Sequence, residues 1–289
     1  MPTFDTPEPI SVTVELGVGD IRIVASDRTD TSVEVRPSDS AKKADVTAAQ
    51  QTQVEYAGGR LLIKAPKGRR QYTFRGGGES IAVQIDLPAG SHVRGQAGIA
   101  ALHCTGRLGE CHFKTGAGDI HVVQTGPVQF KTGIGDITVE RVVGDAALTT
   151  GSGALRIDSI DGSAVVKNSN GDTWIGEITG DLRVNAANGK IVVEQSQAAV
   201  AAKTANGDVH LREVTRGTVL AETALGKVDV GIHNGVTAWL DLDTRYGKVH
   251  TDLDATEPPD GGEDAVKVRA RSSFGDITIR RAPTPRTTR

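Results

Sequence analysis

Two cysteines and two histidines lie close together in the chain and are the side chains best suited to bind zinc. They are His103, Cys104, Cys111 and His112, and thiolates and imidazoles are the ligands that zinc takes in proteins. Their spacing departs from the C-x2–4-C of structural zinc sites, and the alternation of apolar residues around both cysteines turns the thiols inward. A buried cysteine usually serves as a small hydrophobic residue. We therefore expect no metal and no cofactor in this segment.

Aspartate follows glycine at several points, and stacked carboxylates are the ligands that calcium prefers. Examples are Asp136, Asp172 and Asp208, but lysine takes the same place at Lys190 and Lys227. A row that mixes acidic and basic side chains can neutralise itself between adjacent strands. The pattern therefore favours charge pairing between neighbouring strands over a calcium site.

Carboxylates are also numerous enough to supply the acid and the base of a polysaccharide lyase or hydrolase. They are spread along the chain without a motif that brings two of them together. We keep a carbohydrate-active enzyme as the alternative to a non-catalytic protein. The carboxylates concerned are Asp136, Glu140, Asp158, Asp172, Glu177 and Asp208.

Aromatic and basic side chains are the candidates for contact with a partner. Trp174 and Trp239 fall at outward positions of alternating segments, where an exposed tryptophan can anchor a protein or a sugar. The alternative is an indole lying over the strands. Arg69, Arg70 and Tyr72 belong to a basic, glycine-rich segment, which suits an anionic partner or forms a solvated loop.

An internal repeat sets the elements that carry these residues. Glycine recurs at positions 135, 153, 171, 189 and 207, at intervals of 18 residues, and is usually followed by Asp or Lys and then by Ile or Val. Apolar and polar residues alternate after each glycine, which is typical of a β-strand. The expected inward column reads, in this order, Ile137, Leu155, Thr173, Ile191, Val209, Val228, Val249 and Ile277.

Stacked coils bury such a column. One coil cannot cover its own apolar face, whereas coils in register form continuous aliphatic ladders. The sequence predicts an all-β fold, a β-solenoid of stacked coils of about 18 residues. A left-handed hexapeptide helix is excluded because Asp161 stands where its pattern needs an aliphatic residue. A serial antiparallel meander is the competing architecture.

The two ends of the chain differ from the repeats. Residues 1–97 contain longer alternating segments and a short helix expected over 40–49. We expect them to form an irregular β-rich N-terminal cap, because a bare end would expose unpaired edge groups. Residues 98–281 are the predicted solenoid, and 282–289 are predicted to be a disordered tail.

Charge and composition narrow the function further. The 33 Lys and Arg residues against 36 Asp and Glu give a net charge of −3, which does not suit nucleic acid as the main partner. The chain shows no secretory signal pattern and no run long enough for a membrane span. We therefore expect a cytoplasmic protein.

The repeats resemble the bacterial DUF4097 family of adhesin-like β-strand-repeat proteins. The likeness rests on residues 81–90 (IAVQIDLPAG) and on the serial Gly-Asp-Ile copies after them, and covers about residues 10–281. It implies a β-helical repeat fold and offers no catalytic residues. We expect a non-catalytic scaffold that engages a protein or carbohydrate partner on its strand faces, with self-association through its ends as a further expectation.

Overall fold

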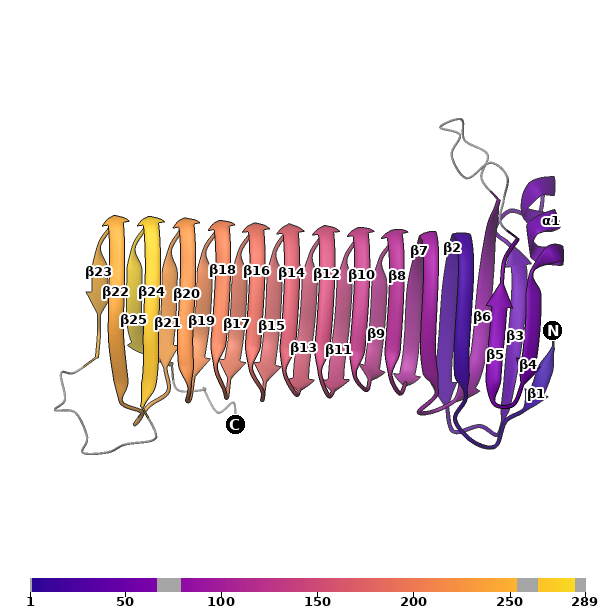
Figure 1. The fold of residues 1–289 in the computed structure, drawn as a ribbon, viewed down its shortest axis with the longest axis horizontal. Coiled ribbons are helices and arrows are strands. Elements are labelled where there is room, and N and C mark those ends of the chain that lie inside the picture. Colours follow the sequence, from indigo (N-terminus) through magenta and orange to yellow (C-terminus); the bar gives the residue numbers. More distant parts are fainter. Residues whose placement is uncertain (1, 67–78, 254–264, 284–289) are drawn as a thin grey trace, which may run out of the picture. The chain divides into compact units, whose positions relative to one another are not determined.

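A computed structural model describes residues 2–66, 79–253 and 265–283 of the chain. The chain divides into two compact units, Met1–Val143 with Thr149–Gly151 (unit 1) and Gly144–Leu148 with Ser152–Arg289 (unit 2). Most of the described residues are in β-strands (Figure 1). Arg69, Arg70 and Tyr72, which the sequence predicted as partner contacts, lie outside the described residues.

Unit 1 combines long and short strands with the helix α1 (Lys43–Gln51). Its two longest strands, β2 and β7, have 16 residues each. The strands are β1 (Thr3–Asp5), β2 (Ser11–Ser26), β3 (Asp30–Pro37), β4 (Gln53–Ala57), β5 (Arg60–Lys64), β6 (Ser80–Pro88), β7 (His92–Arg107), β8 (Cys111–Ala117), β9 (Ile120–Thr125), β10 (Val128–Ile134) and β11 (Ile137–Val143).

Parallel strands in register build the core of unit 1. β2 pairs with β6 and β7, β7 pairs with β9, and β9 pairs with β11. The shared register places one aliphatic side chain of each strand in a column, and none of these side chains is more than 1% exposed. Burying a side chain of this size stabilises a fold by about 1.5–3 kcal/mol. The column is Val83, Ile21, Leu102, Ile120 and Ile137.

Antiparallel strands and a helix close the N-terminal end of unit 1. β3 pairs antiparallel with β6 and with β1, and β4 pairs antiparallel with β5. α1 contacts β3 and β6, where the carboxylate of Asp45 accepts the backbone N–H of Ser80 at 3.1 Å and pairs with Lys42 Nζ at 3.1 Å. The parallel register begins with β2, and the boundary expected at residue 97 falls inside β7.

Unit 2 consists of short strands, two to a coil. β12 (Ala146–Ser152) has residues in both units. The other strands are β13 (Leu155–Asp161), β14 (Ala164–Asn170), β15 (Thr173–Ile178), β16 (Leu182–Asn188), β17 (Ile191–Ser196), β18 (Val200–Asn206), β19 (Val209–Val214), β20 (Thr218–Leu225), β21 (Val228–Ile232), β22 (Ala238–Tyr246), β23 (Val249–Thr251), β24 (Val266–Phe274) and β25 (Ile277–Arg281).

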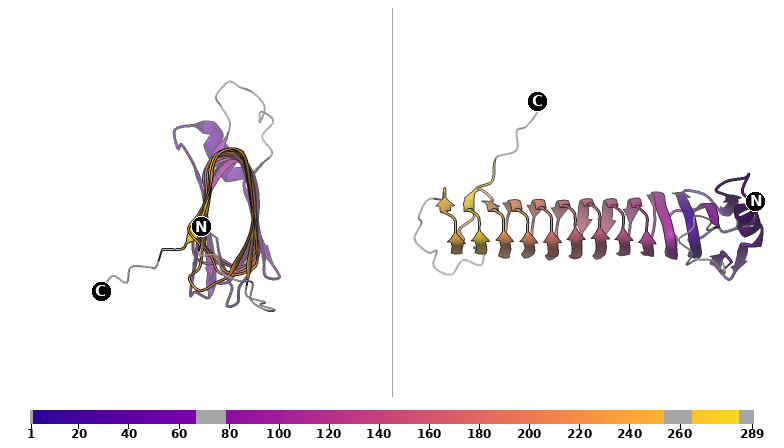
Figure 2. Two further views of the ribbon diagram at one scale, coloured as in Figure 1. Left: turned by 90° about the vertical axis from the view of Figure 1, so that its left-hand side faces the viewer. Right: turned by 90° about the horizontal axis from the view of Figure 1, so that it is seen from above.

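The predicted stack of coils is confirmed in unit 2. Each strand from β13 to β19 pairs in parallel with the strand two places further along the chain. An antiparallel meander would instead pair consecutive strands, so that alternative is wrong. Figure 2 shows the coils of unit 2 as flattened loops, with strands along two opposite faces. The inward column is Leu155, Thr173, Ile191, Val209 and Val228.

The last two coils of unit 2 stack in the reverse of their sequence order. β24 lies between β20 and β22, and β25 lies between β21 and β23 (Figure 1). Ile277 therefore has Val228 as its register partner on one side and Val249 on the other. The order predicted for this end of the column was wrong. The coil in the inner position is buried, since Val266 and Val268 of β24 are 0% and 2% exposed.

A glycine shapes the corners between successive strand pairs, and at several of them an aspartate follows it. At Gly189, φ is +134°, and a Cβ added there would lie 2.1 Å from the carbonyl oxygen of Gly171 in the coil before it. Asp172 Oδ1 accepts the backbone N–H of Lys190 at 2.8 Å, and Asp208 Oδ1 accepts that of Lys227 at 2.8 Å. The sequence predicted that these aspartates pair with lysines of neighbouring strands. The carboxylates instead accept hydrogen bonds from backbone N–H groups of the next coil.

Candidate functional site

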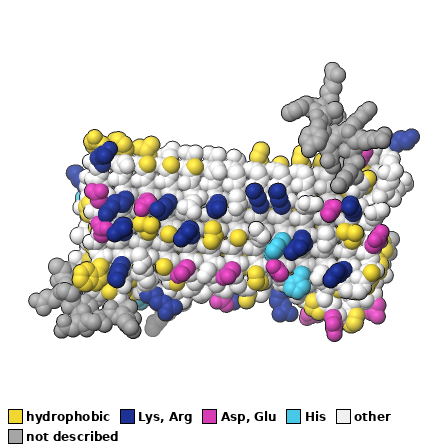
Figure 3. All heavy atoms as spheres, viewed as in Figure 1, with side chains coloured by type: hydrophobic (Ala, Val, Ile, Leu, Met, Phe, Trp, Pro, Cys, Tyr) yellow, Lys and Arg dark blue, Asp and Glu magenta, His cyan; other side chains and the backbone are white. Residues whose placement is uncertain are grey.

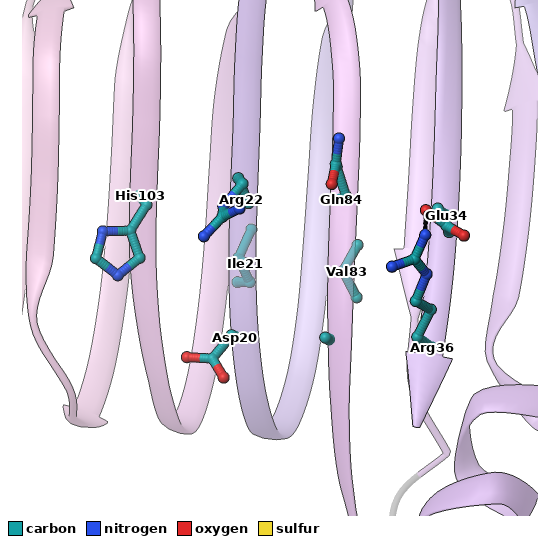
Figure 4. A pocket seen from close by; sticks show the side chains of 9 residues that line it. Asp20, Ile21, Arg22, Glu34, Arg36, Val83, Gln84 and His103 are labelled. Carbon is teal, nitrogen blue, oxygen red and sulfur yellow. Dashed lines mark ion pairs between the residues drawn. The ribbon is translucent and has the colours of Figure 1, made fainter. Parts of the chain in front are cut away.

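A groove on the outward surface of unit 1 gathers polar side chains from β2, β3, β6 and β7 (Figure 4). Its volume is about 430 Å³, which lies in the range of small-ligand pockets. We call it the strand-face groove. Its lining residues are Asp20, Ile21, Arg22, Glu34, Arg36, Ala82, Val83, Gln84 and His103.

Strand register brings these side chains together. On β6, Gln84 lies opposite Glu34 of β3 on one side and Arg22 of β2 on the other. Arg22 in turn lies opposite His103 of β7. Because residues two apart on a strand share a face, the outward side chains form rows across four strands. Figure 4 shows Gln84, Arg22 and His103 projecting from three adjacent strands.

The strand-face groove is hollow because the row next to that of Gln84 and Arg22 contains one short side chain. Ala82 of β6 stands between Arg36 of β3 and Asp20 of β2. Its methyl group leaves an open floor that the longer neighbours border. The walls are polar, while Ile21 and Val83, which are 1% exposed, contribute mainly backbone.

The groove balances two positive and two negative charges. Arg36 pairs with Glu34, with 2.6 Å between the guanidinium nitrogen and the carboxylate oxygen. Among the described residues, no hydrogen bond or ion pair engages the side chains of Asp20, Arg22 and His103, and all three are exposed. The groove therefore offers one carboxylate, one guanidinium and one imidazole to a ligand.

The structure places the two predicted tryptophans in different surroundings. Trp174 of β15 is half-buried beneath Arg156, whose guanidinium carbon lies 3.8 Å from the ring centroid. The indole Nε1–H donates to Glu194 Oε1 at 3.0 Å, and Arg212 pairs with Glu194 at 3.2 Å. The indole thus lies over the strand face, with Arg156 above its ring and Glu194 bound to its Nε1–H. Trp239 of β22 is 54% exposed.

A second charged cluster lies on β19, β21 and β25 of unit 2. Asp229 pairs with Arg280 through two hydrogen bonds of 3.0 and 3.1 Å, and His210 Nδ1 lies 3.7 Å from its carboxylate. The nearby His210 imidazole lowers the pKa of Asp229, and Arg280 lowers it further against the opposing effect of burial. This cluster ties strands of successive coils together.

Both cysteines are inside the core. Cys104 and Cys111 are free thiols with 0% exposure. Burial raises the pKa of Cys111 to about 12 and raises that of Cys104 well above its usual value, so both remain neutral thiols. Within the described part of the chain, no group of three or more His, Cys, Asp and Glu side chains is placed to hold a metal ion.

Sequence reasoning missed the strand-face groove and a buried polar ladder. The hydroxyls of Thr132 and Thr223 donate to the carbonyl oxygens of Gly118 and Gly207 at 3.1 and 2.8 Å, and Asn168 Nδ2 donates to that of Gly171 at 2.8 Å. The signal was a Thr or Asn two residues beyond an inward apolar residue. The groove had one signal, the early Gly-Asp-Ile copy that contains Asp20.

The fold and the surface define a β-solenoid with outward polar rows and a shallow groove. The family model described as Toastrack DUF4097 matches residues 9–280, and the chain belongs to this family. No curated protein matches the sequence. Among the described residues, no helix has the length and apolar character needed to cross a membrane.

The solved structures to which the chain is similar are distant in sequence. A putative adhesin from Bacteroides fragilis is 13% identical, with 96% of this chain and 95% of that chain covered and a TM-score of 0.41. A putative adhesin from Parabacteroides distasonis is 13% identical over 96% and 95% of the two chains, with a TM-score of 0.39. A putative lipid binding protein from the same species is 11% identical over 98% and 96%, with a TM-score of 0.31.

Proposed function

We propose that the protein is a non-catalytic binding scaffold whose strand-face groove holds a neutral, hydroxylated ligand such as a segment of a glycan. The observation that carries the proposal is the set of exposed side chains for which the described chain shows no hydrogen bond or ion pair, Asp20, Arg22 and His103, around the open floor at Ala82.

The donors and acceptors of the groove match hydroxyl groups. A sugar hydroxyl both donates and accepts a hydrogen bond. Arg22 only donates, Asp20 only accepts when ionised, and Gln84 and neutral His103 do both. Charged partners make the stronger hydrogen bonds. The groove can therefore engage several hydroxyls of one ligand.

The charge balance favours a neutral ligand over an anion. Arg22 and Arg36 are offset by Asp20 and Glu34, and Glu34 already neutralises Arg36. An anionic ligand would meet one uncommitted arginine and one uncommitted aspartate, so its net attraction would be small. A polyol needs no net charge on the protein.

Binding without hydrolysis agrees with the carboxylates present. Hydrolysis of a glycosidic bond uses two carboxyl groups with different roles. In the groove Glu34 is held by Arg36 at 2.6 Å, which leaves Asp20 as the uncommitted carboxylate. This arrangement supports ligand binding over the acid–base catalysis of a carbohydrate-active enzyme.

A glycan array probed with the tagged full-length chain tests the proposal. We expect binding to neutral oligosaccharides that is lost in Arg22→Ala and in Asp20→Asn. Arg183→Ala, on the outward row of β16 in unit 2, is the matched control and should bind as wild type does. Absence of binding to any neutral glycan, or equal binding by all variants, would overturn the proposal.

A further inference from the structure

The outermost coil of unit 2 has a free edge. β22 pairs with β24, and β23 pairs with β25. No described strand pairs with the other edge of β22 or β23. An unpaired edge of nine residues, the length of β22, is an open template for another strand.

The core is open at this edge. Leu240 and Val249 are 37% and 44% exposed, whereas their register partners in the next coil, Val268 and Ile277, are 2% and 0% exposed. The described residues thus leave inward positions of the last coil in contact with solvent. Solenoids normally cover such an end with a cap.

Aromatic side chains surround the open edge. Trp239 and Tyr246 of β22 are 54% and 63% exposed, and Phe274 of β24 is 52% exposed. Tyr246 stacks on Phe274 with 4.8 Å between the ring centroids. Figure 3 shows hydrophobic side chains gathered where β20, β22 and β24 end. Exposed aromatic residues in a group of this kind mark protein interfaces.

The two ends of the chain are not equivalent. The N-terminal end of unit 1 is closed by the antiparallel strands β1, β3 and β4 and by α1. Head-to-tail stacking would place the nine residues of β22 against the outer strands of that end, β1 and β4, which have only three and five residues, and would extend without limit. Contact between two identical open edges instead closes the assembly as a two-fold dimer.

We propose that the free edge of β22 pairs with the same edge of a second copy of this chain, antiparallel about a two-fold axis at Leu242. In this pairing, a residue that precedes Leu242 by a given number of positions faces the partner residue that follows Leu242 by the same number. All nine residues of β22, from Ala238 to Tyr246, then find a partner. The two Leu242 side chains meet and cover both open cores.

The outward residues are complementary in this register. Trp239 faces the partner's Arg245, and the chain already contains this pair in adjacent strands, since Arg156 lies opposite Trp174 with its guanidinium 3.8 Å above the ring. Asp243 faces the partner's Asp241. That aspartate is bound by Arg269 at 2.9 Å and by Arg271 at 2.7 Å, so the cluster is net positive and attracts Asp243.

The proposal is independent of the groove, because every groove residue belongs to unit 1. Arg22→Ala should therefore leave the dimer unchanged, and the two proposals can fail separately.

Sedimentation velocity of the full-length chain over a range of concentrations is the first test. We expect a monomer–dimer equilibrium. Leu242→Arg should raise the dimer dissociation constant about tenfold or more, because it places two like charges on the axis. Ile134→Arg, at a position 65% exposed in unit 1, is the control and should leave it unchanged. A monomer at every concentration, or a dimer unaffected by Leu242→Arg, would overturn the proposal.

Cysteine cross-linking is the second test and does not depend on a destabilising charge. Leu242→Cys should form a reducible dimer under mild oxidation, because each thiol faces its own copy across the axis. Cys104 and Cys111 are buried and should not cross-link, and Ile134→Cys should stay monomeric. Failure of Leu242→Cys to cross-link would refute the proposal. Slow hydrogen exchange along β22 in a monomer would show that the chain covers this edge itself and would refute it as well.

Discussion

Replacing Gly189 with alanine should lower the free energy of unfolding by about 2–6 kcal/mol. The added Cβ would lie 2.1 Å from the carbonyl oxygen of Gly171, whereas a carbon and a carbonyl oxygen normally approach to about 3.3 Å. The two coils must separate locally, and such overpacking costs about 1–3 kcal/mol. The φ of +134° adds about 1–3 kcal/mol of strain for an L-residue.

A second glycine in unit 2 isolates the effect of coil contact. Gly235 has a φ of +84°, but a Cβ added there meets nothing within 4 Å. Gly235→Ala should therefore cost only the backbone strain, about 1–2 kcal/mol. Urea unfolding followed by far-UV circular dichroism measures both variants against wild type. Equal losses in the two variants would refute the close approach of successive coils at this corner.

Three further predictions concern the interior and the charged cluster. Thr223→Val should lower the free energy of unfolding by about 1 kcal/mol, because the hydroxyl that donates to the Gly207 carbonyl at 2.8 Å is lost; an unchanged urea midpoint would contradict this. Cys104 and Cys111 should resist a thiol reagent at pH 8 in the native chain, because both thiols are buried with raised pKa values, and should react after unfolding in guanidinium; fast native labelling would count against the packing. Asp229 has a pKa below its ordinary 3.8, so its stabilising effect is present above that value and lost as the pH falls through the lower folded-state pKa. Asp229→Asn should therefore lower the melting temperature more at pH 6 than at pH 2; equal effects at both pH values would exclude this role.

The sequence predicted the coils because their signal is local. Leu155, Thr173 and Ile191 recur at equal intervals, and each strand pairs with the strand one coil away. Equal spacing then suffices to align the columns. At the C-terminal end the intervals lengthen, and spacing no longer fixes which coil docks first. The order of Ile277 and Val249 depends on which coil packs against β20 and β21, and this is visible only in the packed structure.

The strand-face groove could not be predicted because its residues come from separate segments. Arg36 and Ala82 meet through the antiparallel pairing of β3 with β6, and this pairing lies outside the repeat. The hollow depends on which side chain lies between Arg36 and Asp20, which is a matter of register. Similarly, alternation placed Trp174 outward but could not show that Arg156 lies over it.

Binding at the strand-face groove is tested most directly by titration calorimetry with an oligosaccharide bound by the wild-type chain. Ala82→Leu fills the groove floor and removes none of its polar groups. Ala201→Leu makes the same change at an outward, half-buried position of β18 in unit 2. We predict that Ala82→Leu weakens binding about tenfold or more, while Ala201→Leu binds as wild type does. Equal affinities for the three proteins would contradict ligand binding in this groove.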